Sequence, residues 1–366
     1  MKKLYLLTDT FPKGFFDGAI QRIQELQRPN GAIPWFDGGV FDPWNHVEAA
    51  MGLATAGIIE DAERAYRHLA ETQLEDGSWW GQYGSAVPLD DDKYVGEGDE
   101  QAKRDSNFAA YISTGVWHHY LITQKDDFLK EYWPVVQAAT DWVLTLQSDE
   151  GEIRWAADDP QTRQDDALLT GCSSIYKSLE CSILIAQELG HGWQRWAEAR
   201  ARLGDAIRHK PHRFDRSWEP KDRFSMDWYY PVLSGALTDD AARARLASKW
   251  DEFVTEGSGC RCVNDQPWVT VAETCELALA LLHTGQETKA KEMFSWIHQW
   301  RDDDGAYWMG YQYAEDVPWP REKPAWTAGA VLLAADALYK VTPACNLLVE
   351  TRIPETTEQG ERLYHR

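Results

Sequence analysis

The sequence predicts an all-α protein, an (α/α)6 toroid of six helical hairpins. Two observations lead to this fold class: a loop motif that recurs along the 366 residues, and helices that alternate between buried and water-facing types. The motif is Gln, three residues, Gly and, a few positions later, Trp. A motif that recurs at intervals of this kind is typical of an array of similar supersecondary units.

Four copies of the motif are clear. They begin at Gln27, Gln73, Gln147 and Arg301, where Arg replaces Gln, and each has Gly four positions later. The loops contain Trp35, Trp79, Trp155 and Trp308, and two weaker loops contain Trp218 and Trp268. Six loops predict six hairpins.

The helices fall into two sets. Segments that are apolar nearly all round are predicted to be inner helices, and segments with one charged side are predicted to face water. Asp42 before Pro43 is a strong start signal for the first inner helix. The inner helices are expected at 42–56, 106–123, 167–189, 227–237, 270–283 and 325–339. The outer helices are expected at 14–28, 59–72, 126–147, 193–209, 239–253 and 286–301. Because one hairpin cannot bury its apolar side alone, the six should close into a ring.

The domain organisation follows from this count. Residues 1–342 are expected to form one toroid domain, since closed toroids of this size have one continuous core. Residues 343–366 are polar and unpatterned, which predicts a loosely packed C-terminal tail. The long segment from Tyr83 to Arg104 between an outer and an inner helix is a candidate lid.

Composition limits the partners. A net charge of −22 argues against nucleic acid, which is bound through Lys and Arg. No stretch approaches the ~20 apolar residues of a membrane span, and the apolar run near the N-terminus is too short for a signal peptide. The six cysteines lack the density of a secreted framework, so a cytoplasmic location is expected. No cofactor is expected and no metal, because Cys260 and Cys262 are separated by one residue and have no partner pair.

The motif on alternating helices resembles two groups of α/α toroid proteins. One is the six-hairpin glycosidases, and the other joins the terpenoid cyclases and the protein prenyltransferases. The likeness covers most of residues 14–340, and residues 117–142 are similar to helix pairs of glucoamylase-like toroids. The first group implies a sugar substrate and the second an isoprenoid. The acidic run 90–92 departs from the cyclases' Asp-x-Asp-Asp motif, and 170–172 lacks the Asp of the prenyltransferase zinc site.

All six loops run from an outer helix to an inner one, so they should meet at one end of the ring, beside the positive N-termini of the inner helices. Glu48 and Glu273 are the strongest functional candidates there, because a carboxylate inside an apolar helix requires a polar cavity. Asp42, Asp166 and Asp227 have the alternative role of helix N-caps. His46 is either a core hydrogen-bonding residue or a ligand binder.

We predict Glu273, Asp227 and Asp105 as catalytic residues. Burial should raise the pKa of Glu273 and make it the acid, and the helix N-terminus should keep Asp227 ionised as the base. Neighbouring inner helices pack ~8–10 Å apart, which favours the wider carboxylate spacing of an inverting glycosidase. The predicted substrate-binding residues are Asp42, His46, Glu48, Trp35, Trp44, Trp79, Trp155, Asp166, Trp228, Tyr229, Tyr230, Trp268, Trp308 and Trp326.

Three functions fit these residues. Paired carboxylates with aromatic rings suit hydrolysis of a glycoside, because the rings stack on sugars while the carboxyl groups transfer protons. The same rings could stabilise a carbocation derived from an isoprenoid. A toroid that binds carbohydrate without catalysis needs only the tryptophans.

Overall fold

The computed structural model describes residues 10–83, 87–88, 94–95, 103–157, 165–217 and 219–353. The prediction of a mostly helical chain is confirmed, and a helix is present at each of the twelve predicted positions. Most of the candidate lid lies outside the described residues. None of the described helices is both long and apolar enough to cross a bilayer.

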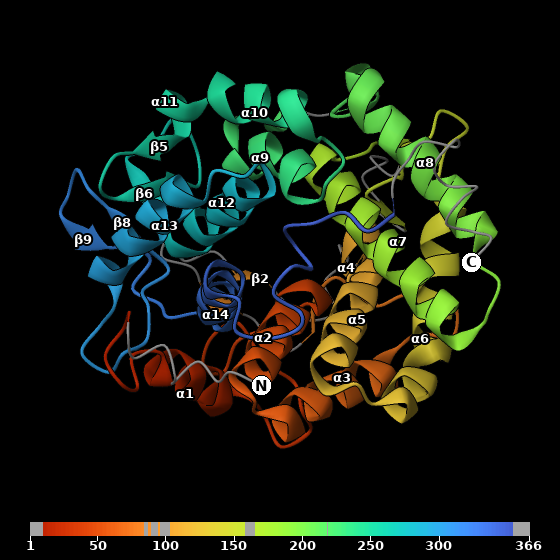
Figure 1. The fold of residues 1–366 in the computed structure, drawn as a ribbon, viewed down its shortest axis with the longest axis horizontal. Helices are drawn as coiled ribbons and strands as arrows, with labels where there is room; N and C mark the ends of the chain where they lie inside the picture. The colour runs from red at the N-terminus through yellow and green to blue at the C-terminus, as the bar shows by residue number, and fades with distance from the viewer. Residues whose placement is uncertain are drawn as a thin grey trace.

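The inner helices make a closed ring (Figure 1). They are α2 (Pro43–Ala56), α4 (Ser106–Ala110) with α5 (Ile112–Thr123), α7 (Leu169–Leu189), α9 (Ser225–Leu233), α12 (Val271–His283) and α14 (Ala325–Tyr339). Each contacts the next in this order, and α14 contacts α2. Their apolar surfaces meet in one large core cluster.

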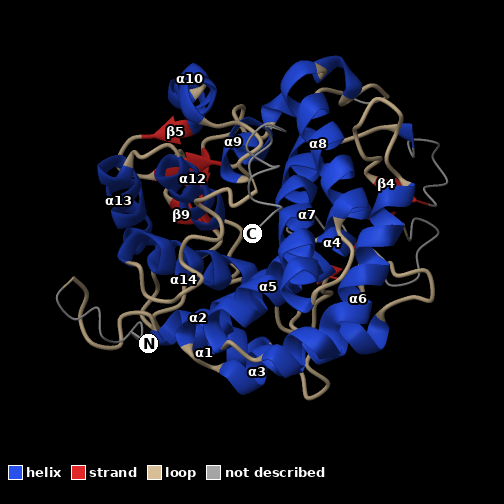
Figure 2. Cartoon of the chain, turned by 45° about the vertical axis from the view of Figure 1, so that its right-hand side comes forward, coloured by secondary structure: helices blue, strands red, loops and turns tan. Residues whose placement is uncertain are grey.

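An outer helix packs on each inner one (Figure 2). The outer helices are α1 (Asp17–Leu26), α3 (Ile59–Thr72), α6 (Asp126–Thr145), α8 (Gln194–His209), α10 (Asp239–Ser248) with the short α11 (Trp250–Phe253), and α13 (Glu287–Trp296). Helix α1 packs on α14, the last inner helix, so the first and last hairpins meet and close the ring.

The repeated motif fixes the spacing of the outer helices. The amide of Gln73 donates to the carbonyl of Gly77 (3.0 Å) in its own loop and to that of Val135 (3.0 Å) in α6. Gly77 has φ +94°, and an added Cβ would lie 2.3 Å from the carbonyl oxygen of Ala138. Gln27 and Gln147 bond the next outer helix in the same way. Each clear Gln copy therefore joins its loop to the following outer helix.

Small sheets were not predicted. Strands β5 (Val254–Thr255), β6 (Gly259–Arg261), β7 (Trp268–Thr270), β8 (Gly310–Gln312) and β9 (Val317–Pro318) form one antiparallel sheet in that order. Strands β3 (Arg104–Asp105) and β4 (Ala156–Ala157) form a second pair, and β1 (Val87–Pro88) and β2 (Tyr94–Val95) a third. Strands of two or three residues are too short to show the alternation that identifies a strand in sequence.

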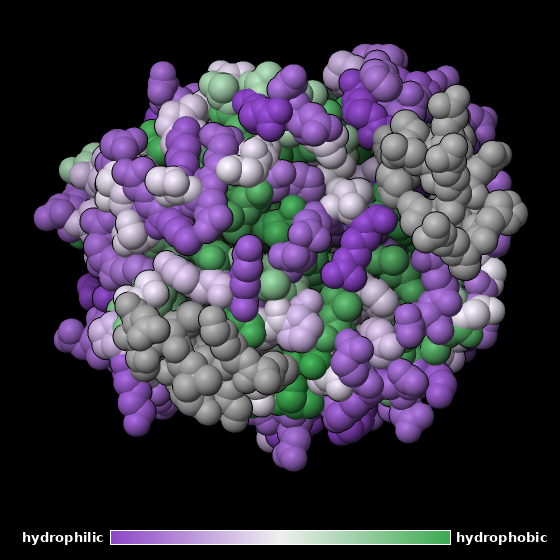
Figure 3. Space-filling view, in the orientation of Figure 1, coloured by the Kyte–Doolittle hydropathy of each residue, from purple (hydrophilic) through white to green (hydrophobic). Residues whose placement is uncertain are grey.

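The expectation of a loose tail is wrong for residues 343–353, which together with residues 341 and 342 are called here the closing segment. It crosses the centre of the ring (Figure 1) and buries Val341, Leu347 and Ile353. The buried Lys177 donates to the carbonyl of Glu350 (2.7 Å), and Arg200 donates to that of Ile353 (3.1 Å). The face of the molecule seen in Figure 1 is polar at its rim, with apolar residues towards its centre (Figure 3). The segment's apolar residues have no regular period, so sequence patterning missed them.

Candidate active site

A cavity lies on the axis of the ring, and all six inner helices contribute to it. Its lining, which includes Leu348 of the closing segment, is Glu48, Tyr111, Ser174, Lys177, Tyr230, Leu233, Ser234, Cys275, Glu276, Leu279, Ala330, Leu333 and Leu348. Two carboxylates stand in this mainly apolar cavity, Glu48 from α2 and Glu276 from α12. Both come from the second turn of their helix, just inside the end where the N-termini meet.

Glu48 accepts hydrogen bonds from the indole of Trp44 (3.1 Å) and the phenol of Tyr111 (3.3 Å). Trp44 precedes it by one helical turn, so both side chains lie on the same face of α2. Burial raises the pKa of Glu48 well above its usual value, and repulsion from Glu276 adds to the effect. Glu48 was predicted from the sequence, and in the structure it lines a mainly apolar cavity in which Trp44 and Tyr111 donate hydrogen bonds to it.

Glu276 accepts hydrogen bonds from the phenols of Tyr229 and Tyr230, the latter at 2.6 Å. Burial raises its pKa to about 7, although both hydrogen bonds act in the opposite direction. Glu276 was not among the residues predicted from the sequence. The signal was present, because Glu273 and Glu276 are three positions apart in an otherwise apolar helix and therefore lie on one face.

A second cavity opens at the N-terminal ends of α4 and α7. Its lining is Trp44, Asp105, Ser106, Asn107, Phe108, Ile153, Trp155, Leu168, Thr170, Gly171 and Cys172. Trp44 lines this cavity and also bonds Glu48 of the axial cavity, so the two cavities are neighbours. Trp44, Trp155 and Asp105, all predicted from the sequence, meet here.

Asp105 is the N-cap of α4. Its Oδ1 accepts from the backbone N–H groups of Asn107 (2.8 Å) and Phe108 (3.1 Å). Among the described residues no donor bonds its Oδ2. Burial raises the pKa of Asp105 to about 7, and the charge of Asp42 contributes. The group is therefore about half protonated near neutral pH.

Asp42 is fully buried at the start of α2. It accepts from the indole of Trp35 (2.6 Å) and from the backbone and side-chain amides of Asn45 (2.9 and 2.6 Å). Burial raises its pKa. The N-cap role considered for Asp42 is confirmed.

Glu273 stands in the first turn of α12 and is partly exposed. The thiol of Cys262, just after β6, hydrogen-bonds to it, and together with burial this raises the pKa of the thiol well above its usual value. The charge of Glu273 in turn raises the pKa of Glu276.

The carboxylates at this end form a connected set, which we call the carboxylate row. Asp42 raises the pKa of both Asp105 and Glu48, Glu276 raises that of Glu48, and Glu273 raises that of Glu276. Repulsion of this kind between neighbours requires short separations. Its members belong to the N-terminal parts of α4, α2 and α12.

Asp227 lies outside this row. Its carboxyl group is buried near Arg245 and Lys249, on the side of α10, and it lines neither cavity. Burial raises its pKa to about 6, so the expectation that a helix N-terminus keeps its pKa low is wrong in direction. The prediction that Asp227 and Glu273 meet at one cavity fails, because neither residue lines either cavity and α9 turns Tyr229 and Tyr230 towards Glu276 instead.

His46 is a core residue. Its Nδ1 accepts from the N–H of Ile33 (3.1 Å), and its Nε2 donates to the carbonyl of Ala65 (2.9 Å). Burial lowers its pKa to about 3, so the ring is neutral. The core alternative considered for His46 is therefore the one that the structure supports.

Trp79 and Trp228 are also core residues. Trp79 is 1% exposed and donates to the carbonyl of Leu69 (2.9 Å). Trp228 is 2% exposed, donates to the carbonyl of Arg245 (2.6 Å) and stacks on Phe253. Both side chains pack towards outer helices, and neither lines a cavity.

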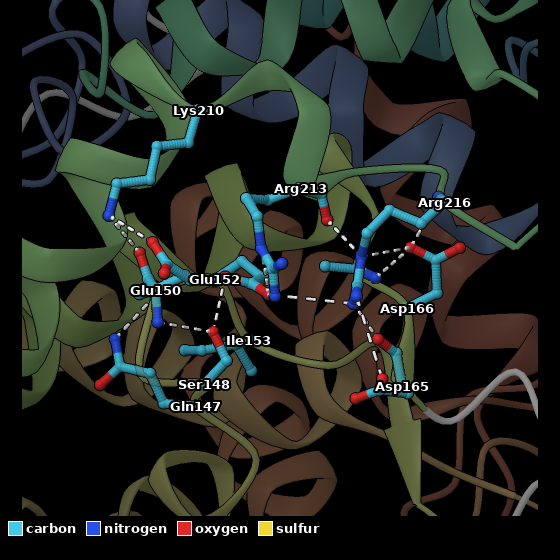
Figure 4. A network of polar contacts seen from close by, with 12 residues as sticks. Gln147, Ser148, Glu150, Glu152, Ile153, Asp165, Asp166, Lys210, Arg213 and Arg216 are labelled. Atoms are coloured by element: carbon cyan, nitrogen blue, oxygen red, sulfur yellow. Dashed lines mark hydrogen bonds and ion pairs between the residues drawn. The ribbon is translucent and has the colours of Figure 1, made fainter.

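Asp166 organises a loop (Figure 4). It accepts from the backbone N–H groups of Ala167 (2.7 Å), Arg216 (3.0 Å) and Ser217 (2.6 Å). Although burial alone would raise its pKa, these hydrogen bonds bring the pKa of Asp166 below its usual value. Because its hydrogen-bond partners are backbone groups of the loop, Asp166 has a structural role.

The remaining predicted tryptophans contact other aromatic or basic side chains. Trp326 packs edge-on against Trp35 (centroids 5.5 Å apart), and the ammonium group of Lys323 lies 4.7 Å from the Trp308 ring. Trp268 packs edge-on against Trp319 (4.8 Å). In the part of the chain that the structure describes, no group of three His, Cys, Asp or Glu side chains could hold a metal ion.

Solved structures show how widespread this fold is. A glycosidase variant in complex with glucose superposes with a TM-score of 0.66 at 15% identity, covering 89% of this chain and 96% of that one. A GH63 mannosylglycerate hydrolase from Thermus thermophilus superposes at 0.64 and 14%, covering 87% and 99%. A D-mannose isomerase superposes at 0.63 and 12%, covering 90% and 100%. At these identities the likeness concerns the fold alone.

Sequence comparison is more specific. No family model matches the chain. It is 46% identical over 338 residues to the MMP endo-(1,4)-3-O-methyl-alpha-D-mannosidase of Mycolicibacterium hassiacum, an alignment that covers 92% of this chain and 90% of that protein. The chain therefore belongs to the same family as this mannosidase and is a glycoside hydrolase.

Proposed function

We propose that this chain is an (α/α)6-toroid endo-mannosidase that cleaves α-(1→4) bonds within oligosaccharides of 3-O-methylmannose. The support for the substrate is the 46% identity to the mycobacterial mannosidase over nearly the full length of both chains. The support for the site is the carboxylate row beside Trp35, Trp44 and Trp155. Aromatic rings bind sugar faces, and pairs of carboxyl groups hydrolyse glycosidic bonds.

Asp105 is the proposed general acid. A carboxyl group with a pKa of about 7 is about half protonated at neutral pH, far more than an ordinary Asp, and its Oδ2 is free among the described residues to donate to a leaving oxygen. It also lines the second cavity beside Trp44 and Trp155, which gives the leaving sugar aromatic surfaces to pack on.

Glu273 is the proposed general base. It lies at the opposite end of the row from Asp105, on α12, and is partly exposed. Tyrosines bond both oxygens of Glu276, and the cap of α2 uses Asp42, so Glu273 is the row's most accessible carboxylate on that side. An inverting reaction by this pair requires ~6.5–9.5 Å between the two carboxyl groups, with the attacking water between them.

The test compares Asp105→Asn and Glu273→Gln on a 3-O-methylmannose oligosaccharide. Asn is itself a good N-cap, so Asp105→Asn should fold. Each change should lower kcat by ~10²-fold or more, because each removes a proton-transfer group. Asp105→Asn should regain rate on an aryl mannoside whose leaving group needs no proton, whereas Glu273→Gln should be rescued only by added azide.

Asp227→Asn is the matched control, since this buried carboxyl group lies outside the row and should keep wild-type kcat. Full activity in Asp105→Asn together with a large loss in Asp42→Asn would move the acid to Asp42. Full activity in both row variants would overturn the assignment of the pair. Release of an isoprenoid product, or sugar binding without turnover, would favour one of the other two functions.

A further inference from the structure

We propose that the outward face of the β5–β9 sheet is a carbohydrate-binding subsite. Trp268 and Trp319 would form it and would bind sugar residues of the oligosaccharide beyond the bond that is cleaved. The class of ligand rests on the proposed function, whereas the position of the subsite rests on the geometry of the sheet.

The sheet register brings the two tryptophans to one face. Trp268 pairs with Gln312, and Gln312 pairs with Val317, so these three side chains point to the same side. Trp319 follows Val317 by two positions, and its N–H donates to the carbonyl of Gly310 (3.0 Å), so the pairing extends to it. Trp319 therefore shares the face of Trp268.

The two rings are held rigidly and remain accessible. Trp319 is 40% exposed, and the indole N–H of Trp268 donates to its carbonyl (2.6 Å). The ring planes meet at 80° with centroids 4.8 Å apart. Gly310 permits this, because an added Cβ would lie 2.6 Å from Nε1 of Trp268. Core packing gives no reason to fix an exposed ring in this way.

The chemistry of the face suits a sugar. Two rings at a steep angle present a small corner whose apolar surfaces match the C–H faces of a pyranose. The side-chain oxygen of Gln312 accepts from two backbone N–H groups of the following turn, at residues 314 and 315. Its amide N–H groups then have no acceptor among the described residues and can bond sugar hydroxyls. A stable protein partner would require a far larger contact, on the order of 1,000 Å².

Two connections link this face to the elements that carry the carboxylate row and its tryptophans. Strand β7 runs directly into α12, so one short segment carries both Trp268 and Glu273. Beside Gly310, Met309 packs into the cluster that contains Trp35 and Trp326. A chain bound at the row could therefore extend across the sheet without leaving the protein surface.

The experiment measures Trp319→Ala with a short and a long α-(1→4) oligosaccharide of 3-O-methylmannose. Dissociation constants come from titration calorimetry in a Glu273→Gln background, and KM values come from the wild-type background. We expect the Kd and KM of the long oligosaccharide to rise roughly 5- to 10-fold, as for loss of one stacked ring. The short oligosaccharide and kcat should change less than about twofold. Tyr313→Ala is the control, because Tyr313 is 37% exposed and directly follows Gln312, on the opposite face.

Equal affinity of Trp319→Ala and the wild type for the long oligosaccharide would overturn the subsite, as would an equal loss in Tyr313→Ala or on the short one. Selective weakening of long-chain binding in a protein that hydrolyses neither oligosaccharide would support the subsite and overturn the proposed reaction. Failure of the wild-type protein to bind the long oligosaccharide would overturn both.

Discussion

Asp105 combines two requirements that conflict energetically. As an N-cap it stabilises α4 best when it is ionised, yet burial and the nearby Asp42 favour its protonated form. A carboxyl group that is kept protonated near neutral pH is useful to a glycosidase, because it can protonate the leaving oxygen. We expect this property to reduce stability at the pH where it serves catalysis.

The pH dependence of stability tests this conflict. The folded pKa of Asp105 is about 7, above its usual 3.8, so the folded state binds more protons between these values. The free energy of unfolding should therefore fall as pH rises from about 4 to 7. Asp105→Asn removes the charge and keeps a cap, so it should match wild type near pH 4 and gain up to about 4 kcal/mol at pH 8, since each pKa unit corresponds to about 1.4 kcal/mol.

Urea unfolding at both pH values measures this gain. Asp127→Asn is the control, because this fully exposed side chain also lies in the first turn of a helix. Its effect should be small and equal at the two pH values. A gain for Asp105→Asn that does not grow with pH would show that the pKa of this group is not raised.

Single elements differ in how far sequence predicts them. The inner and outer helices were predictable because their apolar patterns extend over ten or more residues. Glu48 could be predicted too, as one carboxylate in an apolar helix. The rotation of α9 about its own axis could not be predicted from the sequence. Asp227, Trp228 and Tyr230 lie on three sides of this nine-residue helix, and each could face the centre of the ring. The short strands beside Trp319 could not be predicted either, because their pairing depends on contacts between residues distant in the sequence.

The role of the Gln-x-x-x-Gly motif in spacing the outer helices can be tested at its glycine. Gly77→Ala should destabilise the protein by roughly 3 kcal/mol or more. The reason is that the new Cβ would meet the Ala138 carbonyl at 2.3 Å, in addition to the strain of a positive φ. Gly57→Ala is the matched control, because Gly57 has φ +84° and open space around it. It should cost only about 1–2 kcal/mol.

Chemical denaturation of both variants gives the comparison. Their difference isolates the close packing between the motif's loop and α6 from backbone strain alone. Equal losses would mean that the motif does not set the spacing of the outer helices, and that Gln73 and Gly77 serve only their own turn.

At the scale of the whole molecule, ring closure has two parts, and only one was visible in the sequence. The count of six motif loops predicted the circular order, which the contact of α1 with α14 completes. The closing segment was not visible, because its few apolar residues are spaced irregularly and its main contacts are made by backbone carbonyls. Those contacts depend on the buried side chains Lys177, Glu180 and Arg200, which come from two helices far away in the chain.

Glu180 is the centre of this arrangement. It is 1% exposed, and its oxygens pair with Lys177 (3.1 Å) and Arg200 (2.6 Å) and accept from the N–H of Arg352 (3.1 Å). Although burial alone would raise its pKa, the two cations bring the pKa of Glu180 below its usual value. The carboxylate therefore stabilises the fold above about pH 4.5, and this contribution is lost as pH falls through the folded pKa.

We therefore expect Glu180→Gln to cost about 3–5 kcal/mol at pH 7, because it leaves two buried cations without their counter-ion. Glu150→Gln should cost less than about 1 kcal/mol, since Glu150 pairs with Lys210 at a side-chain exposure of 56%. Urea unfolding of both variants at pH 7 and near pH 4 measures these two costs. The cost of Glu180→Gln should shrink at the lower pH, because there the unfolded chain takes up a proton on Glu180 more readily than the folded protein does. A cost that is small at pH 7, or that is the same at both pH values, would mean that the closing segment is held by its apolar side chains rather than by this buried charge cluster.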